Sequence, residues 1–161
     1  MNKYLLIAFA ITTCIFFGCK KNGSNPSTSK SQWSILGKSY TADTTYFNPN
    51  PLIMDLEAHD SSGNEADVSF RYKPIANGTF NVIDEGTITY SNDLDSSQCV
   101  LNVTSGGSTY YYSAGSQGTI GTVTVSITAG GKLNISFSNV KLKNVYDGSD
   151  STVVSGTLHE Q

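Results

Sequence analysis

The sequence of 161 residues is short of positive charge, cysteine and histidine, and each shortage narrows what the protein can do. Ten lysine and arginine residues stand against thirteen aspartate and glutamate residues, with no concentrated basic stretch. A nucleic-acid-binding protein needs a basic face, so we expect no nucleic-acid partner. The only long apolar run, residues 4–17, is shorter than the roughly 20 residues that span a bilayer. We therefore expect no membrane-spanning helix.

Cysteine is too scarce to form a disulfide in the main part of the chain. Cys14 and Cys19 lie near the N-terminus, and Cys99 stands alone. A lone thiol can act as a nucleophile, but no histidine lies near Cys99 in sequence and its strand pattern places it inward. We therefore interpret Cys99 as a buried structural residue. The two histidines, His59 and His159, form a catalytic triad or a zinc site only with converging partners.

Residues 1–18 have the organisation of a secretory signal peptide. Lys3 supplies a positive start, an apolar segment follows, and a small residue precedes the expected cut. Residues 16–19, Phe-Phe-Gly-Cys, resemble the lipobox of bacterial lipoproteins in the loosened form found in Bacteroidota. The resemblance implies cleavage after Gly18 and attachment of lipid to Cys19, so that several acyl chains hold the protein to a membrane.

The same resemblance implies a place in the cell envelope, with the lipid anchor in the outer membrane. Surface-exported lipoproteins of Bacteroidota tend to carry acidic residues soon after the lipidated cysteine. Here Lys20 and Lys21 follow Cys19, so we expect the protein to face the periplasm. Residues 19–32 comprise the lipidated cysteine and a segment rich in Ser, Asn and Lys, a composition typical of a flexible linker.

From residue 33 to residue 161 the pattern changes to short alternating runs of Thr, Val, Ile, Tyr and Phe, separated by Gly, Asn, Asp and Ser. Such alternation indicates β-strands with one face towards a core. We expect one all-β domain, an antiparallel β-sandwich of about nine or ten short strands. A β-barrel of the calycin type is the alternative. The same texture resembles small all-β lipoproteins of Bacteroidota, and this resemblance brings no active site with it.

The parity of the alternation predicts how the strands pair in hairpins. A two-residue turn at Gly106-Gly107 would place Val103 opposite Tyr110, so that Tyr110 and Tyr112 face the core. Tyr111 would then face outward. We name Tyr111 as the candidate surface-binding residue, because an exposed tyrosine can stack on a sugar ring or contact a partner protein.

Other hairpins follow from the same reasoning. Trp33 meets Tyr40 across a tight turn, and a three-residue loop pairs Val125 with Ile135. After that loop the apolar phase jumps, which predicts a bulge near Ser138-Asn139. Shorter strands are expected at residues 79–82, 87–90 and 152–158.

Residues 52–72 predict a further hairpin, in which Leu56 pairs with Phe70. This register would bring two favourable outward pairs together across the strands. The pairs are Asp55 with Arg71, and His59 with Asp67.

Candidate metal ligands gather in sequence only around His59. Asp55, Glu57 and His59 share one outward strand face, where successive side chains stand about 7 Å apart. This spacing favours a solvated polar face over a metal site, so we expect no metal, no cofactor and no catalytic residue. Residues 147–150 lack the acidic spacing of a calcium loop and predict a turn. His159 lies near the C-terminus and is expected to fray.

An anchor, a linker and a β domain without a visible catalytic set favour a non-enzymatic module that binds a partner protein or a glycan. The alternative is a hydrolase of envelope or dietary polymers that uses paired carboxylates from the acidic residues 55–95. It requires two carboxyl groups about 5–10 Å apart in a groove. A further alternative is a carrier of a small apolar ligand, which requires a hollow barrel.

Overall fold

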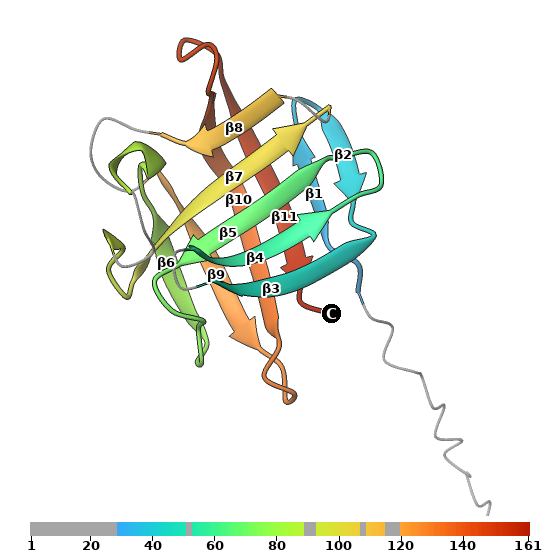
Figure 1. The fold of residues 1–161 in the computed structure, drawn as a ribbon, viewed down its shortest axis with the longest axis vertical. Coiled ribbons are helices and arrows are strands. Elements are labelled where there is room, and N and C mark those ends of the chain that lie inside the picture. Colours follow the sequence, from blue (N-terminus) through green and yellow to red (C-terminus); the bar gives the residue numbers. More distant parts are fainter. Residues whose placement is uncertain (1–28, 51–52, 89–92, 107–108, 115–119) are drawn as a thin grey trace, which may run out of the picture.

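Eleven β-strands and one turn of 3-10 helix form the secondary structure of the residues that the computed structural model describes (Figure 1). These residues are 29–50, 53–88, 93–106, 109–114 and 120–161. The elements are β1 (Gln32–Ile35), β2 (Lys38–Thr41), β3 (Thr44–Asn50), β4 (Ile53–His59), β5 (Glu65–Phe70), β6 (Gly78–Val82), η1 (Glu85–Thr87), β7 (Gln98–Ser105), β8 (Thr109–Ser113), β9 (Gly121–Ile127), β10 (Leu133–Asn144) and β11 (Ser151–His159). The predicted all-β class is confirmed. The predicted signal peptide, the lipobox and residues 19–28 of the predicted linker lie outside the described residues.

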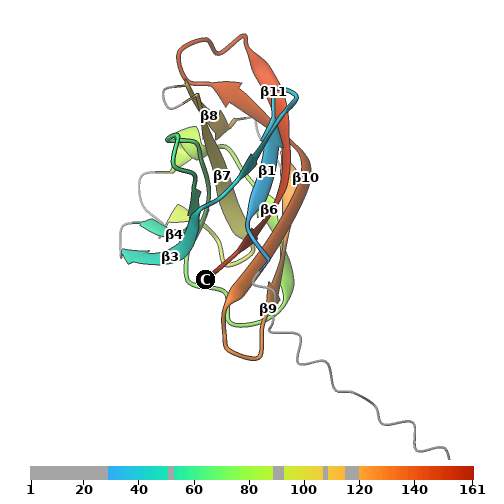
Figure 2. The ribbon, with the colours of Figure 1, turned by 90° about the vertical axis from the view of Figure 1, so that its right-hand side faces the viewer.

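The hydrogen-bonded pairing of the strands closes on itself. β10 pairs with β9, β9 with β6, β6 with β7, β7 with β8, and β8 returns to β10. From this small barrel β11, β1 and β2 extend on one side, and β5, β4 and β3 extend on the other. Figures 1 and 2 show two facing layers, as in the sandwich that the sequence favours. Because the pairing closes, however, the fold is a barrel, which is the alternative predicted from the sequence. All pairs are antiparallel except β6 with β7, which is parallel.

The predicted bulge lets β10 serve both layers. Its first residues, Leu133–Phe137, pair with β9, and Leu142–Asn144 pair with β8. The register along β11 shifts between Phe137 and Val140, and Asn139 takes a positive φ of 53° there. Because of this extra length, Phe137 and Val140 both face the core, at 5% and 0% exposure.

Three predicted local features are confirmed. Trp33 lies opposite Tyr40, and their rings stack with centroids 5.6 Å apart. Val125 lies opposite Ile135, and the backbone of Thr128 bonds that of Lys132, which leaves the expected loop of residues 129–131. The strands expected at 79–82 and 152–158 are present in β6 and β11. The strand expected at 87–90 is not confirmed, because Thr87 ends η1 and residues 89–90 lie outside the described ranges.

The register of the β7–β8 hairpin differs from the prediction by one residue. Ser105 lies opposite Thr109, so three residues rather than two connect the strands, and Val103 lies opposite Tyr111. A slip of one residue turns every side chain of a strand to the other face. Tyr111 is therefore in the core at 3% exposure, and its proposal as a surface-binding residue is wrong. Tyr110 and Tyr112 lie on the outer face.

The interior between the layers is occupied by one cluster of apolar side chains. Leu56, Phe70, Leu101, Ile135 and Leu158 represent the strands of both layers, and all are at most 1% exposed. Burial of this kind stabilises by roughly 1.5–3 kcal/mol for each large apolar side chain. Among the described residues, no helix has the length and hydrophobicity needed for a membrane crossing.

Candidate functional site

The outer face of the β3–β4–β5–β7–β8 layer carries the candidate site. Leu56 and Ala58 point into the core, so the alternating residues of β4 point outward. β5 behaves likewise, because its residues 66, 68 and 70 are buried in the core cluster. The outward positions form registered rows, of which one is Tyr46–Glu57–Asp67–Asn102–Tyr112 and the next is Thr44–His59–Glu65–Thr104–Tyr110.

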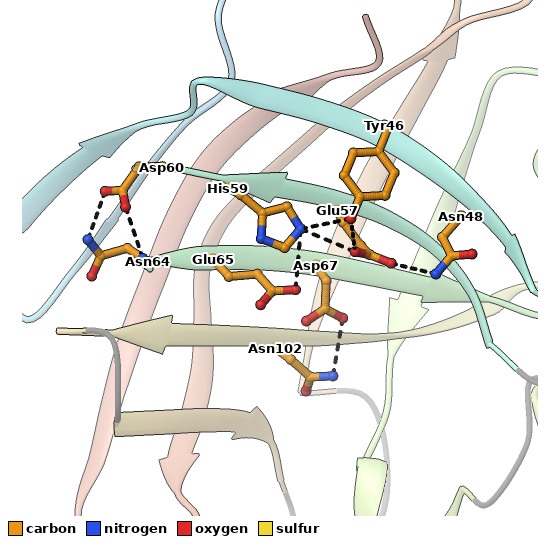
Figure 3. Close-up of polar contacts among 9 residues, drawn as sticks. All are labelled: Tyr46, Asn48, Glu57, His59, Asp60, Asn64, Glu65, Asp67 and Asn102. Carbon is orange, nitrogen blue, oxygen red and sulfur yellow. Dashed lines mark hydrogen bonds and ion pairs between the residues drawn. The ribbon is translucent and has the colours of Figure 1, made fainter. Parts of the chain in front are cut away.

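The turn between β4 and β5 decides which of these side chains meet. The Asp60 carboxylate accepts bonds from the backbone N–H groups of Ser62 and Asn64, at 2.8 and 2.9 Å. Its second oxygen accepts a bond from the Asn64 amide at 2.7 Å (Figure 3). This closed turn leaves His59 opposite Glu65 and Leu56 opposite Val68.

The predicted pairs across β4 and β5 are therefore corrected. The register is displaced by two residues, which keeps each side chain on its predicted face but changes its neighbour. Asp55 lies opposite Ser69 instead of Arg71, and His59 lies opposite Glu65 instead of Asp67. The result is a concentration of carboxyl groups rather than a set of balanced pairs.

Glu57, His59 and Glu65 form a triad on this face, beside the turn between β4 and β5 (Figure 3). His59 Nε2 lies 3.1 Å from Glu57 Oε2 and 3.8 Å from Glu65 Oε1. One potential ligand atom from each residue lies within 4.8 Å of the other two. All three side chains are partly buried, so the triad is shielded yet reachable from solvent.

Two residues of β3 hold the triad in place. The Tyr46 hydroxyl donates to Glu57 Oε2 at 2.8 Å, and the ring stacks on His59 with centroids 5.6 Å apart. The Asn48 amide donates to Glu57 Oε1 at 2.8 Å, so each oxygen of that carboxylate has a donor (Figure 3). Glu57 and His59 are thereby oriented before any ligand arrives.

These contacts separate the acidities of the two glutamates. Burial alone would raise the pKa of Glu57, but hydrogen bonds from Asn48, Tyr46 and His59 hold it below the ordinary value. The pKa of Glu65 is raised, first by burial, although the charge of His59 opposes the rise. The hydrogen bond to Glu57 raises the pKa of Tyr46 to about 12, so its phenol stays protonated at neutral pH.

A second group of acids lies beside the triad. Asp67 accepts a bond from the Asn102 amide at 3.3 Å, and η1 brings Glu85 over the same part of the sheet. The Tyr110 hydroxyl donates to Glu85 Oε1 at 3.1 Å. Burial raises the pKa of Asp55 to about 6, and it raises the pKa of Asp67 and of Glu85 above their ordinary values.

The triad matches the donor set of several divalent metals. An imidazole nitrogen with two carboxylate oxygens is a ligand set that proteins use for Zn²⁺ and related ions. Metal–ligand bonds of about 2.0–2.2 Å place neighbouring ligand atoms about 3.5 Å apart. The two distances to His59 Nε2, 3.1 and 3.8 Å, are already close to that spacing. The potential ligand atoms of Glu57 and Glu65 lie within 4.8 Å of each other.

The other residues singled out from the sequence are placed as follows. Cys99 is buried, and burial raises the pKa of its thiol to about 12, so its interpretation as a structural residue is confirmed. Residues 147–150 form the predicted turn, closed by a backbone bond from Asp150 to Asp147 at 2.9 Å. His159 does not fray: it ends β11, and its Nδ1 lies 2.8 Å from Asn134 Oδ1.

Tyr46, Asn48 and Glu65 are not among the site residues predicted from the sequence. Glu65 lies six residues beyond His59, and its partnership depends on the length of the Asp60–Asn64 turn. Tyr46 and Asn48 belong to an edge strand for which no pairing was predicted. Their alternation, Thr44–Tyr46–Asn48, was the available signal, because it places three polar-tipped side chains on one face.

No protein-family model matches this sequence, and no curated protein or solved structure matches it either. The function is therefore inferred from the geometry and chemistry of the site.

Proposed function

We propose that this protein is a lipid-anchored protein of the cell envelope whose β domain is a non-enzymatic binding module for a divalent transition-metal ion such as Zn²⁺. The ligands are Glu57, His59 and Glu65. The observation that carries the proposal is the convergence of these three side chains on one point of the outer sheet face. A partner protein or a glycan with a cationic group would meet the same face, but the triad matches a metal ion more closely.

The residues around the triad support a metal ion over a bare ion pair. Asn48 and Tyr46 orient Glu57, as outer-sphere groups orient metal-binding carboxylates. The lowered pKa of Glu57 keeps it ionised and ready to bind at neutral pH. An open coordination position would remain for water or for a group of a partner molecule.

Binding is preferred to hydrolysis because of the shape around the carboxylates. Glu57 and Glu65 have pKa values moved in opposite directions, as an acid and a nucleophile require. However, of two surface hollows in the described part of the chain, of about 430 and 580 Å³, neither is lined by these carboxylates. One lies over β1, β2 and β11, and the other lies along residues 70–80 with Ser96 and Ser97. A polymer-cleaving enzyme needs its groove over the carboxylates.

Calorimetric titration with Zn²⁺ tests the metal site. The unaltered protein is expected to bind one equivalent, His59→Ala to lose the binding, and Asn48→Ala to bind about 10–100-fold more weakly. His159→Ala is the matched control, since it removes the other histidine, which bonds Asn134 away from the triad. Equal binding by the unaltered protein and by His59→Ala would reject the proposal.

The anchor has its own test. Cells that express the chain and are fed a labelled fatty acid should incorporate label into the protein, and the protein should sediment with outer membranes. Cys19→Ala should abolish the labelling and release the protein from the membrane fraction. Labelling that survives Cys19→Ala would show that the lipid is attached to another residue.

A further inference from the structure

The chain between β5 and β6 borders a hollow at the surface, apart from the triad. Residues 70–80 line this hollow, together with Ser96 and Ser97 directly before β7. Its volume of about 580 Å³ lies within the range of roughly 300–1,000 Å³ that is usual for small-molecule sites in proteins. The core cluster occupies the interior between the layers, so a small ligand bound here would lie at the surface of the barrel.

Apolar side chains gather around the hollow and stay in contact with solvent. Ile75 is 93% exposed and Tyr72 is 57% exposed, and both line it. Phe70 and Phe80, which also line it, pack edge to face with ring centroids 5.0 Å apart. Single exposed apolar residues are common in proteins, but several of them around one concave surface are typical of a ligand site.

The charged residues that line the hollow are all basic. They are Arg71 and Lys73, with no aspartate or glutamate, although acidic residues outnumber basic ones in the chain as a whole. The charge of Lys73 is balanced by Glu160, because their charged atoms lie 2.6 Å apart. Arg71 forms no ion pair within the described residues, since even Asp95, whose charge acts on it, lies too far away for one. The hollow therefore favours an anion.

The guanidinium group of Arg71 is held in place and keeps donors for such an anion. It donates to the backbone carbonyl of Leu94 at 3.1 Å, and its central carbon lies 5.4 Å from the centre of the Tyr72 ring. A guanidinium has five N–H groups in one plane, so the bond to Leu94 leaves others, and their fork matches the two oxygens of a carboxylate. The contact with Tyr72 sets this positive charge beside an exposed aromatic surface.

Bonds to other parts of the fold also hold the lining segment in place. Lys73 is fixed by Glu160 near the C-terminus, and Asn77 Oδ1 accepts a bond from the backbone N–H of Ile127 at 2.8 Å. Pro74, between these two points, is buried. The walls of the hollow are thus ordered before a ligand arrives, which lowers the entropic cost of binding.

We propose that this hollow is a binding site for a small carboxylate that carries an apolar body, either an aliphatic chain or an aromatic ring. Arg71 binds the carboxylate group. Tyr72, Ile75 and Phe80 contact the apolar body and shield it from water. The hollow shares no residue with the triad of Glu57, His59 and Glu65, so this site is independent of the proposed metal binding.

The first test is calorimetry on the purified full chain in phosphatidylcholine nanodiscs, with empty nanodiscs as the background. Octanoate and naphthoate represent the two kinds of apolar body, and at least one of them should bind with one equivalent. Octanol lacks the charge and acetate lacks the apolar body, so each should bind at least about tenfold more weakly than the preferred acid. Binding by only one of the two acids identifies the apolar body that the hollow accepts.

Variants then locate the site. Arg71→Gln should weaken binding of the acid at least about tenfold and leave binding of octanol unchanged. Ile75→Ser should weaken binding of both, and it should leave the fold intact because this side chain is 93% exposed. Lys141→Gln and Val153→Ser are the matched controls, since both residues are exposed on β10 and β11 and neither lines the hollow. Both controls should bind the acid as the unaltered chain does.

Three results would overturn the inference. They are binding of neither octanoate nor naphthoate, equal affinity for octanoate and octanol, and undiminished binding in both Arg71→Gln and Ile75→Ser. If Arg71→Gln does not fold, Ile75→Ser alone decides the location. His59→Ala should bind the acid as the unaltered chain does, so failure of Zn²⁺ binding would reject the proposed function and leave this site intact.

Discussion

Replacing the buried carboxyl group of Asp55 by an amide should stabilise the protein in a pH-dependent way. Asp55 is 7% exposed, and burial is the main cause that raises its pKa from 3.8 to about 6. Its bond with Ser69 opposes this rise. The amide of Asp55→Asn would have the same shape as the carboxyl group and no charge, and its nitrogen could donate to the neighbouring carboxylates.

The magnitude follows from the linkage between protonation and folding. Between pH 3.8 and about 6 the folded protein holds a proton on Asp55 that the unfolded chain has released. Stability from this group is therefore fully present below pH 3.8 and is lost as the pH rises through about 6. At 1.36 kcal/mol for each pH unit, the ionised carboxylate costs about 3 kcal/mol at pH 8.

Asp55→Asn should thus exceed the unaltered protein in free energy of unfolding by up to about 3 kcal/mol at pH 8, and by little at pH 4. Urea denaturation in chelator measures this, with the fluorescence of Trp33 as the probe. Trp33 is the only tryptophan in the chain and is 2% exposed in the folded state.

The control is Asp147→Asn, because hydrogen bonds from Ser149 lower the pKa of that exposed carboxylate. Its difference from the unaltered protein should be small and of opposite sign. A gain in Asp55→Asn that is equal at pH 4 and pH 8, or a loss of stability at pH 8, would refute the reasoning.

Three further predictions concern other parts of the fold. Gly156→Ala should lower the free energy of unfolding by about 1–3 kcal/mol or more in urea titration, because its Cβ would lie 2.6 Å from the Gln32 carbonyl oxygen and 2.9 Å from the Trp33 side chain. Asn139→Ala should cost about 1 kcal/mol in the same assay, and Asn139→Gly nothing, since φ is 53° there. Cys99 should resist a thiol reagent in the folded protein and react within the mixing time in denaturant, and fast native labelling would contradict its burial.

The features that sequence alone predicts well are those in which parity and turn residues agree. Val125 and Ile135 could pair only through an odd loop, because a shorter one would oppose an apolar and a polar side chain. The jump from Phe137 to Val140 could be reconciled with one strand only by a bulge. In both cases the wrong arrangement buries a polar group, so the pattern excludes it.

The β7–β8 hairpin shows where parity gives no information. Tyr110, Tyr111 and Tyr112 are identical, so the sequence does not say which of them faces the core. In the structure Tyr111 and Ser113 are buried. The predicted register, which differs by one residue and turns Tyr110 and Tyr112 inward, looks equally apolar in sequence. The length of the connection after Ser105 decides the register, and a Gly-Gly pair is compatible with either length.

The candidate site shows a second limit. That Asp55, Glu57 and His59 share an outward face follows from alternation and is confirmed. Alternation does not determine which residues of β5 lie opposite them, because displacing the register by two residues leaves every side chain on the same face of the sheet. The hydrogen bonds of the Asp60–Asn64 turn determine the register, and they place Glu65 opposite His59. The prediction instead paired Asp55 with Arg71, which would have balanced their charges.

The pairing of β1 with β11 has a consequence for when the protein can fold. Among the described strands β1 pairs only with β2 and β11, and β11 is synthesised after all the others. Trp33 and Ile35 can therefore pair with β11 only when residues 151–159 have left the ribosome. Contacts between such distant segments form slowly, since a long loop must close first. The pairing of β1 is therefore completed only after β11 has been made.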